Sequence, residues 1–427
     1  MADIISFRGI YFKPQKENKL KNVTCPPYDV ISPKRQEYFY RLHPHNVIRL
    51  ILGRKKSSDT KAINRHSRAA KYFKDWLNTG ILEKEKSPCI YIYRQKYSFQ
   101  NKRYSPVGFI ALSRLESWRE KKILPHEVIF SKYKNDRLQL LRASKANFES
   151  ILALYPHSAR IEKILRKGIV SRPFLKIIDE EKVEHAIYPL SSLKEISVIK
   201  KEMKKRPLFI ADGHHRYQAA LNFSREVNRS KSPPKYKKAD YLMVTFMDME
   251  RSKLTIFPTH RIVSKLPRFS SKRFLDSLRP YFQVEKVSSK IFYQQLKKEA
   301  GGQTAFGLFL GGDNYFLIKL KTRLDLKRLI KEKKSTAWKK LDVAILHKLI
   351  FDKVLKGRAN NYLSYTRSAK EAERKVKTGQ AKMAFFLNPT KIEDIQSIAS
   401  RGERMPPKST YFYPKLRSGL IMREIDG

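Results

Sequence analysis

The chain has 427 residues, with 91 Lys or Arg against 40 Asp or Glu, and a formal net charge of +51. Hydrophobic residues make up 41% of it, which is enough for folded cores and excludes a disordered tail protein. At about 150 residues per domain, the length predicts two or three domains. No apolar run approaches the ~18 residues of a membrane span, and the first residues do not resemble a secretory signal. We therefore expect a cytoplasmic protein without a membrane partner.

The positive charge is spread along the chain rather than gathered in one arm or tail. Basic clusters such as residues 54–56 and 204–206 attract polyanions, including nucleic acid and phosphorylated metabolites. A host whose proteins are all rich in Lys gives the same composition. Nucleic acid is therefore the less favoured partner. The two cysteines, Cys25 and Cys89, are too few for a disulfide framework.

Periodicity and turn residues predict helices and strands along the whole chain. Apolar spacing and breaker residues predict helices over 62–78, 136–147 and 339–355, and a helix that carries Tyr217 to Ser224. A capping box of Thr390 and Glu393 predicts one more helix, ending at Gly402. Loops are expected at 124–127 and 232–234, and a hairpin turn at 311–314. Strands are predicted at 91–97, 107–112, 208–210, 241–247, 254–257, 305–310 and 315–320.

Helices and strands mix without a regular βα alternation, which favours an α+β fold over a doubly wound sheet. The expected division is an N-terminal α+β region at 1–120, a nucleotide-binding core at 121–265 and a C-terminal α+β lobe at 266–427. The oligomeric state is left open.

The sharpest motif is Asp212-Gly213-His214-His215-Arg216, between a short apolar strand and a helix start. A helix N-terminus offers backbone N–H groups to anions, and glycine allows close backbone approach. Arg216 has two donors for a phosphate, and the two histidines would reach different parts of a ligand. Asp212 could cap the helix or help to hold Mg²⁺ among phosphate oxygens. The plainer interpretation is a simple N-cap followed by a solvated basic turn.

Three further segments carry candidate side chains. Glu127, next to His126, could take a proton from a hydroxyl that attacks phosphorus, although an ordinary loop acid is the commoner case. Lys408, Ser409 and Thr410 offer a cation and two hydroxyl groups to a phosphate or carboxylate, as do many surface segments. Asp29 follows two prolines that would hold it rigidly, or that simply shape a structural loop.

Other chemistries have no support in the motifs. The sequence has no paired Cys or His-Glu-x-x-His pattern for zinc, no phosphate-binding Walker loop and no nucleophile elbow. Cys25 has no neighbouring base in the sequence, which argues against a nucleophilic role.

Several motifs together resemble a widespread prokaryotic family, catalogued as domain of unknown function 1015. The resemblance runs nearly end to end. It rests on Pro-Pro-Tyr-Asp-Val-Ile-Ser at 26–32, His-Pro-His-Asn-Val-Ile-Arg-Leu at 43–50, Leu-Pro-His-Glu at 124–127, Lys-Asn-Asp-Arg-Leu at 134–138, Ala-Asp-Gly-His-His-Arg-Tyr at 211–217, Pro-Thr-His-Arg at 258–261 and Met-Pro-Pro-Lys-Ser-Thr-Tyr-Phe-Tyr-Pro-Lys-Leu at 405–416.

The Asp-Gly-His-His-Arg turn also looks like that of the ParB/sulfiredoxin superfamily, where it cradles nucleotide phosphates. The order of motifs is similar to that of the archaeal free serine kinases, which phosphorylate serine with ADP as donor. The resemblance implies a ParB-like core, Glu127 as the catalytic acid group, Asp212 to Arg216 as the nucleotide site and residues 406–410 as a substrate segment. This chain departs from that pattern in its longer stretch between Glu127 and Asp212 and in its N-terminal region, which includes Asp29.

These observations predict a kinase-like enzyme of serine metabolism that acts on a small hydroxylated metabolite, with L-serine or O-phosphoserine first. The expected cofactors are Mg²⁺ and ADP or ATP, and the reaction could run in either direction. Glu127 would act as general base on the attacking hydroxyl, and His126 would help to place that hydroxyl. Lys408, Ser409, Thr410 and Asp29 would contact the small molecule. The rival class is a ParB-like, nucleotide-switched DNA-binding protein, although no helix-turn-helix pattern follows Asp212. A third class is a binding module that holds nucleotide without turnover.

Overall fold

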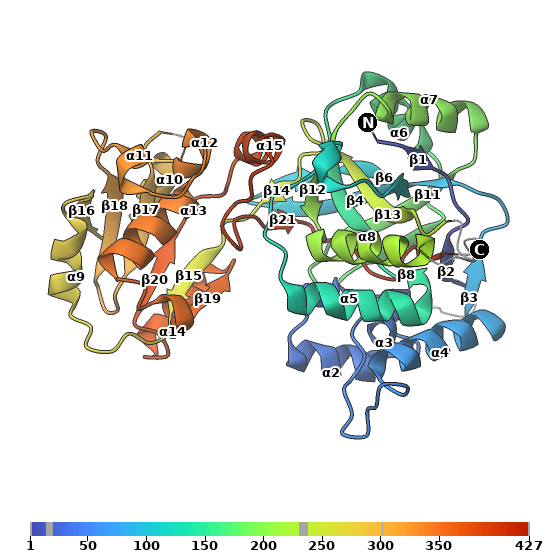
Figure 1. The fold of residues 1–427 in the computed structure, drawn as a ribbon, viewed down its shortest axis with the longest axis horizontal. Helices are drawn as coiled ribbons and strands as arrows, with labels where there is room; N and C mark the ends of the chain where they lie inside the picture. The colour runs from blue at the N-terminus through green and yellow to red at the C-terminus, as the bar shows by residue number, and fades with distance from the viewer. Residues whose placement is uncertain (1, 14–19, 230–237, 301, 426–427) are drawn as a thin grey trace. The chain divides into compact units, whose positions relative to one another are not determined.

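The computed structural model describes residues 2–13, 20–229, 238–300 and 302–425 (Figure 1). Two compact units account for the chain. The first comprises residues 1–125, 129–254 and 414–427, and the second comprises 126–128 and 255–413. The chain thus leaves the first unit twice and returns to it for its last residues. The expected loop at 232–234 lies outside the described residues.

The first unit is built on a ten-stranded mixed sheet with the order β10-β11-β4-β6-β13-β9-β12-β7, to which β1 and β5 add at β6 and β4. Its strands are β1 (Ile4–Ile5), β4 (Ile90–Phe99), β5 (Lys102–Tyr104), β6 (Val107–Arg114), β7 (Ile123–Pro125), β9 (Ile151–Tyr155), β10 (Leu175–Ile178), β11 (Glu184–Leu190), β12 (Leu208–Asp212) and β13 (Tyr241–Asp248). Two short pairs accompany it, β2 (Ile10–Phe12) with β3 (Leu82–Lys84) and β8 (Ala146–Asn147) with β22 (Arg423–Glu424).

Eight helices accompany these strands in the described part of the first unit. They are α1 (Leu20–Val23), α2 (Pro33–Leu42), α3 (Ile48–Ile51), α4 (Arg65–Asn78), α5 (Ser131–Ser144), α6 (Ala159–Gly168), α7 (Leu193–Met203) and α8 (His214–Asn228). Helix α5 packs between α4 and α8 (Figure 1). Most strands pair antiparallel, but β13 runs parallel to β9, and β12 runs parallel to β7. The predicted α+β class is confirmed, and the likeness to a ParB/sulfiredoxin core stays a prediction.

Alternate residues of the central strands form the main core of the first unit. Ile151, Ala153 and Tyr155 of β9 are buried in one cluster with apolar residues of α6, α7 and α8. Side chains two apart on a strand share a face, so this face of the sheet carries the helices. The packing fixes where β12 ends and α8 begins, and that junction holds the sharpest sequence motif.

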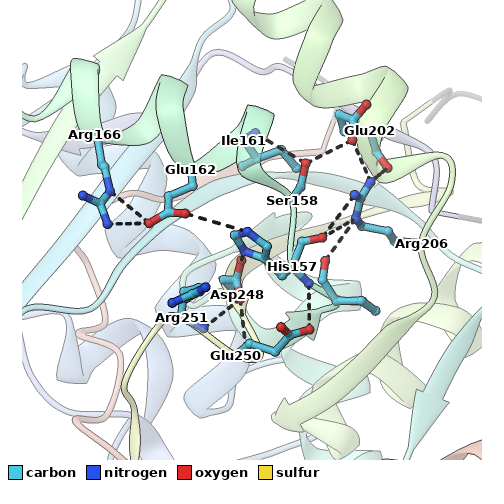
Figure 2. A network of polar contacts seen from close by, with 11 residues as sticks. His157, Ser158, Ile161, Glu162, Arg166, Glu202, Arg206, Asp248, Glu250 and Arg251 are labelled. Carbon is cyan, nitrogen blue, oxygen red and sulfur yellow. Dashed lines mark hydrogen bonds and ion pairs between the residues drawn. The ribbon is translucent and has the colours of Figure 1, made fainter.

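A polar network ties α6 and α7 to the end of β13 (Figure 2). His157 Nδ1 lies 2.7 Å from the carboxylate of Asp248. Ser158, the N-cap of α6, donates to Glu202 of α7 at 3.0 Å, and Arg206 donates to the same carboxylate at 2.9 Å. Because Glu202 is nearly buried, these donors compensate for the lost hydration of its charge. The network therefore serves the packing of these elements.

The second unit contains a six-stranded, fully antiparallel sheet with the order β16-β18-β17-β20-β15-β19. Its strands are β15 (His260–Val263), β16 (Phe282–Val287), β17 (Ala305–Phe309), β18 (Tyr315–Leu320), β19 (Leu363–Thr366) and β20 (Met383–Phe386), and a separate pair joins β14 (Thr255–Ile256) to β21 (Phe412–Tyr413). Its helices are α9 (Ser271–Leu278), α10 (Phe292–Lys298), α11 (Leu326–Leu329), α12 (Thr336–Lys339), α13 (Asp342–Ile345), α14 (Ala369–Lys377) and α15 (Ile392–Ser400).

Two helix predictions in this unit are wrong in detail. The single helix expected over 339–355 is instead α12, the short α13 and a π-helix at Leu346–Val354. The capping box is absent, because Thr390 donates its hydroxyl to the carbonyl of Ser409 at 2.7 Å, and the N-cap of α15 is Lys391. The Thr390 hydroxyl thus bonds to the 405–410 segment instead of capping the helix.

The helix predicted over 136–147 is α5, which begins at Ser131 and ends at Ser144, and Ala146 and Asn147 form strand β8 instead. The remaining elements follow the sequence more closely. All seven predicted strands are present, within one or two residues at each end, and β17 and β18 form the predicted hairpin. The segment expected as a loop at 124–127 begins as strand β7, because Ile123 to Pro125 pair in parallel with β12. Cys25 and Cys89 are buried free thiols. Within the described ranges, none of the helices has the length and apolarity that a membrane crossing requires.

Candidate functional site

The junction between β12 and α8 in the first unit is shaped by Gly213. This residue is the N-cap of α8 with φ 95°, a conformation that L side chains rarely adopt. A Cβ here would also lie 2.6 Å from Cγ2 of Ile151. The glycine therefore lets the chain turn directly from the sheet into a 15-residue helix, whose first-turn N–H groups lack intrahelical acceptors. Such an N-terminus favours an anion.

Asp212 does not cap this helix, so the capping interpretation is wrong. It is the last residue of β12, and its carboxylate lies between two cations. Arg216 donates to Oδ2 at 3.2 Å, and Lys415 Nζ lies 3.1 Å from Oδ1. Both oxygens of Asp212 are thus held by cations next to the start of α8, which neutralises this carboxylate.

Arg216 is nearly buried, and its hydrogen bonds are made to other groups of the protein. Its two terminal nitrogens donate to the carbonyl of Ser150 at 2.8 Å and to Asp212, while its Nε has no hydrogen-bond partner among the described residues. Burial lowers the pKa of Arg216, but the carboxylates of Glu149, Asp212 and Asp29 raise it above its usual value. The guanidinium therefore stays charged and positions Asp212.

The two histidines that follow Gly213 have different surroundings. His214 is 1% exposed. His215 accepts a hydrogen bond from the backbone N–H of Phe130 at its Nε2, 3.0 Å away. Its ring stacks on Phe130 and meets the edge of Tyr133, with ring centroids 6.2 Å and 5.4 Å apart. Because Nε2 accepts, the neutral ring carries its proton on Nδ1.

Asp29 belongs to the same neighbourhood of the first unit. It is exposed, and its charge acts on Arg216 and on Tyr28. The backbone N–H of Tyr28 donates to Glu149 at 3.1 Å, and the guanidinium of Arg137 lies 4.0 Å from the Tyr28 ring centroid. These contacts anchor the Pro-Pro-Tyr-Asp turn at 26–29 close to the buried Arg216.

In the second unit, His126, Glu127 and Thr410 form a chain of hydrogen bonds. His126 is fully buried, and its Nε2 lies 2.9 Å from Oγ1 of Thr410. The Thr410 hydroxyl lies 3.4 Å from Oε1 of Glu127 and donates to it. Since a hydroxyl has one proton, Thr410 accepts from His126, which must carry its proton on Nε2. The carboxylate of Glu127 is thereby oriented by its neighbours.

The three residues of the 408–410 segment differ in exposure. Lys408 is exposed and has φ 58°, whereas Ser409 and Thr410 are nearly buried. Ser409 donates to the carbonyl of Pro406 at 2.6 Å. Arg261, itself fully buried, donates to the carbonyl of Lys408 at 3.1 Å. The segment is rigidly held, and Lys408 is its exposed cation.

The residues present do not form a magnesium site of their own. Within the described ranges no three His, Cys, Asp or Glu side chains are grouped as metal ligands require. The carboxylate of Asp212 faces Arg216 and Lys415, and neighbouring cations oppose the binding of a divalent ion. We therefore regard Mg²⁺ as a part of a nucleotide substrate rather than as a resident metal.

Two residues near the candidate site, Lys415 and Arg261, were not predicted from the sequence. Lys415 belongs to the motif at 405–416, but no role was predicted for it. Its ion pair with Asp212 joins residues that are 203 positions apart. Arg261 ends the Pro-Thr-His-Arg motif, and it supports the carbonyls of residues 407 and 408. In both cases the sequence offered one indication of a role, a cationic residue within a family motif.

A family model described as "Protein of unknown function (DUF1015)" matches residues 4–344, and the chain belongs to this family. A search of curated proteins finds no match. Among solved structures, a conserved hypothetical protein from Pyrococcus furiosus has a TM-score of 0.37 at 13% identity, covering 74% of this chain and 96% of that chain. A free serine kinase in complex with AMP has a TM-score of 0.36 at 13% identity, covering 73% and 92%.

SbnI with a C-terminal truncation, from Staphylococcus aureus, has a TM-score of 0.35 at 11% identity, covering 72% of this chain and 84% of that chain. TM-scores of this size are too low to establish a common fold. The roles of the candidate residues therefore stay predictions.

Proposed function

We propose that the chain is a phosphotransferase that moves a phosphoryl group between a nucleotide and a small hydroxylated metabolite, with free L-serine or O-phosphoserine as the first candidate. The observation that carries the proposal is the β12–Gly213–α8 junction. A helix N-terminus with a positive-φ glycine is suited to phosphate, and Arg216 and Lys415 neutralise the Asp212 carboxylate beside it.

In the first unit, the backbone N–H groups at the start of α8 would bind the donor phosphates. Asp212 would be held by Arg216 and Lys415, where it could orient a donor or acceptor hydroxyl. His215, fixed by the N–H of Phe130, would offer its Nδ1–H to a phosphate oxygen. These groups supply positioning and charge stabilisation, which phosphoryl transfer chiefly requires.

In the second unit, Glu127 would accept the proton of the attacking hydroxyl as the new O–P bond forms and the bond to the nucleotide breaks. Thr410 and His126 act as positioning residues, because their hydrogen bonds orient the carboxylate. Lys408 would supply a cation to the carboxylate or phosphate of the metabolite. Asp29 lies in the neighbourhood of Arg216, and its proposed partner is the amino group of the substrate.

Phosphorus NMR of the purified protein with Mg²⁺ and L-serine, supplied with ADP or ATP in turn, tests this function. We expect a phosphoserine signal that grows as the nucleotide is consumed, which would also identify the donor. Phosphoserine with AMP or ADP tests the reverse direction. If both directions are inert, serine is not the substrate.

The rival class, a nucleotide-switched DNA-binding protein, has one observation in its favour, the net charge of +51. DNA binding that depends on nucleotide and weakens steeply with salt, in a protein without turnover, would favour it.

A further inference from the structure

A cavity of about 500 Å³ lies within the second unit, and its lining includes Val128, next to Glu127, and Pro406 and Pro407 of the 406–410 segment. It is walled by α12, the π-helix at Leu346–Val354, β19 and residues 404–407. Its volume is within the range of pockets that enclose drug-sized ligands, ~300–1,000 Å³. Serine has seven non-hydrogen atoms, and even at about 30 Å³ for each, the volume of a whole water, it would leave more than half of the cavity to solvent. The cavity thus suits a larger molecule than serine.

The charges on its walls do not cancel. Lys348 is neutralised, since its Nζ lies 2.6 Å from Glu332 and 2.8 Å from Asp352. Lys334 and Arg404 also line the cavity, and within the described ranges neither has a carboxylate at ion-pair distance. The cavity therefore carries an excess of positive charge that a bound anion would balance.

Arg404 is held in place beside flat apolar surfaces. Its backbone carbonyl accepts from the indole N–H of Trp338 at 2.7 Å, and its guanidinium donates to the carbonyls of residues 402 and 403. Burial lowers the pKa of Arg404. The ring of Trp338, the ring of Tyr365 and Pro406 supply the apolar part of the lining. A rigid cation next to rings is suited to an anion that carries a ring of its own.

The π-helix brings a further polar group to the wall. Irregular helices of this kind are often found at functional sites. His347 lines the cavity, and its Nε2 is buried without a hydrogen-bond partner among the described residues. Burial and the nearby Arg261 lower the pKa of His347 to about 3, so the ring is neutral at physiological pH. A buried polar atom without a partner indicates a missing ligand or water.

We propose that this cavity is a binding site for a small organic anion, a compact carboxylate or phosphate group attached to a ring-bearing body, with Arg404 and Lys334 as its anion-binding residues. This inference goes beyond the proposed phosphoryl transfer and does not depend on it.

Trp338 offers a direct test, because it is the tryptophan of the second unit, while Trp76 and Trp118 belong to the first. In the full chain with Trp76→Phe and Trp118→Phe, emission would be followed during titration with phenyl phosphate, benzoate and, as a neutral control, benzyl alcohol. We expect saturable changes with one or both anions but not with the alcohol. The two anions distinguish a phosphate site from a carboxylate site.

Arg404→Gln and Lys334→Gln should each weaken anion binding by about tenfold, the effect of losing one charge-assisted hydrogen bond. Lys333→Gln removes the same charge from an exposed neighbour outside the cavity and should leave binding unchanged. Thermal unfolding identifies any variant that does not fold. Absence of saturable binding, or equal loss in Lys333→Gln, would overturn the proposal. ADP binding at Gly213, measured in the same variants, reports separately on the proposed function.

Discussion

Lys415 and Asp212 form an ion pair of 3.1 Å across 203 positions of the chain. The last residues return to the first unit, and Gln95 of β4 holds them there by donating to the carbonyl of Lys415 at 3.1 Å. The side chain of Lys415 thus reaches the end of β12, where α8 begins. The pair neutralises the acid that would otherwise repel phosphates from the helix N-terminus.

Replacing Lys415 by Met should weaken ADP binding by about tenfold, because Asp212 would then repel the phosphates and one favourable charge would be lost. Isothermal titration calorimetry measures the effect. Lys163→Met, at an exposed position of α6, is the matched control and should bind ADP like the wild type. Unchanged affinity in Lys415→Met would remove Lys415 from the nucleotide site.

Gly213→Ala should destabilise the first unit and abolish nucleotide binding. The positive φ costs about 1–2 kcal/mol for an L residue, and the contact of Cβ with Ile151 adds about 1–3 kcal/mol. Gly379 also has a positive φ, 71°, but has no atom within 4 Å of the new Cβ. Gly379→Ala should therefore destabilise the second unit only by the cost of the positive φ, about 1–2 kcal/mol. Urea unfolding followed by tryptophan emission compares the two, and equal losses would contradict the packing argument.

The β12–α8 junction could be predicted because its signals are local. An apolar triplet, a glycine and a helical pattern follow one another at residues 208–224, and each determines its own segment. The same holds for β4 and β6, whose mostly buried apolar and aromatic side chains suit strands of a sheet. The role of Lys415 could not be predicted, since it depends on the chain returning over 203 positions.

Two helix predictions failed in detail although the local sequence pattern is present in both. Apolar residues at 341, 345, 349 and 351 fit an α-helix, yet the backbone widens to a π-helix from Leu346, with Leu355 N–H donating to Ile350 at 2.8 Å. Thr390 and Glu393 have capping-box spacing, but Ser409 takes the threonine hydroxyl. In both cases the local pattern is present, and at Thr390 a tertiary contact decides the geometry.

Asp136→Asn should destabilise the first unit at neutral pH. Burial raises the pKa of Asp136, but hydrogen bonds and charge from His66, Arg137 and Arg65 lower it well below its usual value. Such a group stabilises the fold above the unfolded pKa of about 4 and loses this effect as pH falls through the folded pKa. We expect a loss on the order of 3 kcal/mol at pH 7 that shrinks below about pH 4. Exposed Asp75→Asn is the control, and a pH-independent loss would contradict the account.

Asp342→Asn should act in the opposite sense on the second unit. Burial raises the pKa of Asp342 to about 6, although a hydrogen bond from Thr304 opposes this. The folded state therefore favours the protonated acid, and stability falls as pH rises from about 4 to about 6. The variant should be more stable than the wild type at pH 8, by up to about 3 kcal/mol, and equal to it near pH 4. Asp313→Asn, at an exposed turn, should show no such difference. Denaturation at both pH values measures it, followed by Trp338 emission in the chain with Trp76→Phe and Trp118→Phe.

Glu127→Gln tests the central claim most directly, because it removes the proposed base and retains its size and its hydrogen bond from Thr410. ADP binding by calorimetry and phosphoserine formation by phosphorus NMR would be measured on the same sample. We predict ADP affinity within about twofold of wild type and a rate lower by at least about 10²-fold. The exposed Glu393→Gln should match the wild type in both. Full turnover in Glu127→Gln would contradict the proposed mechanism.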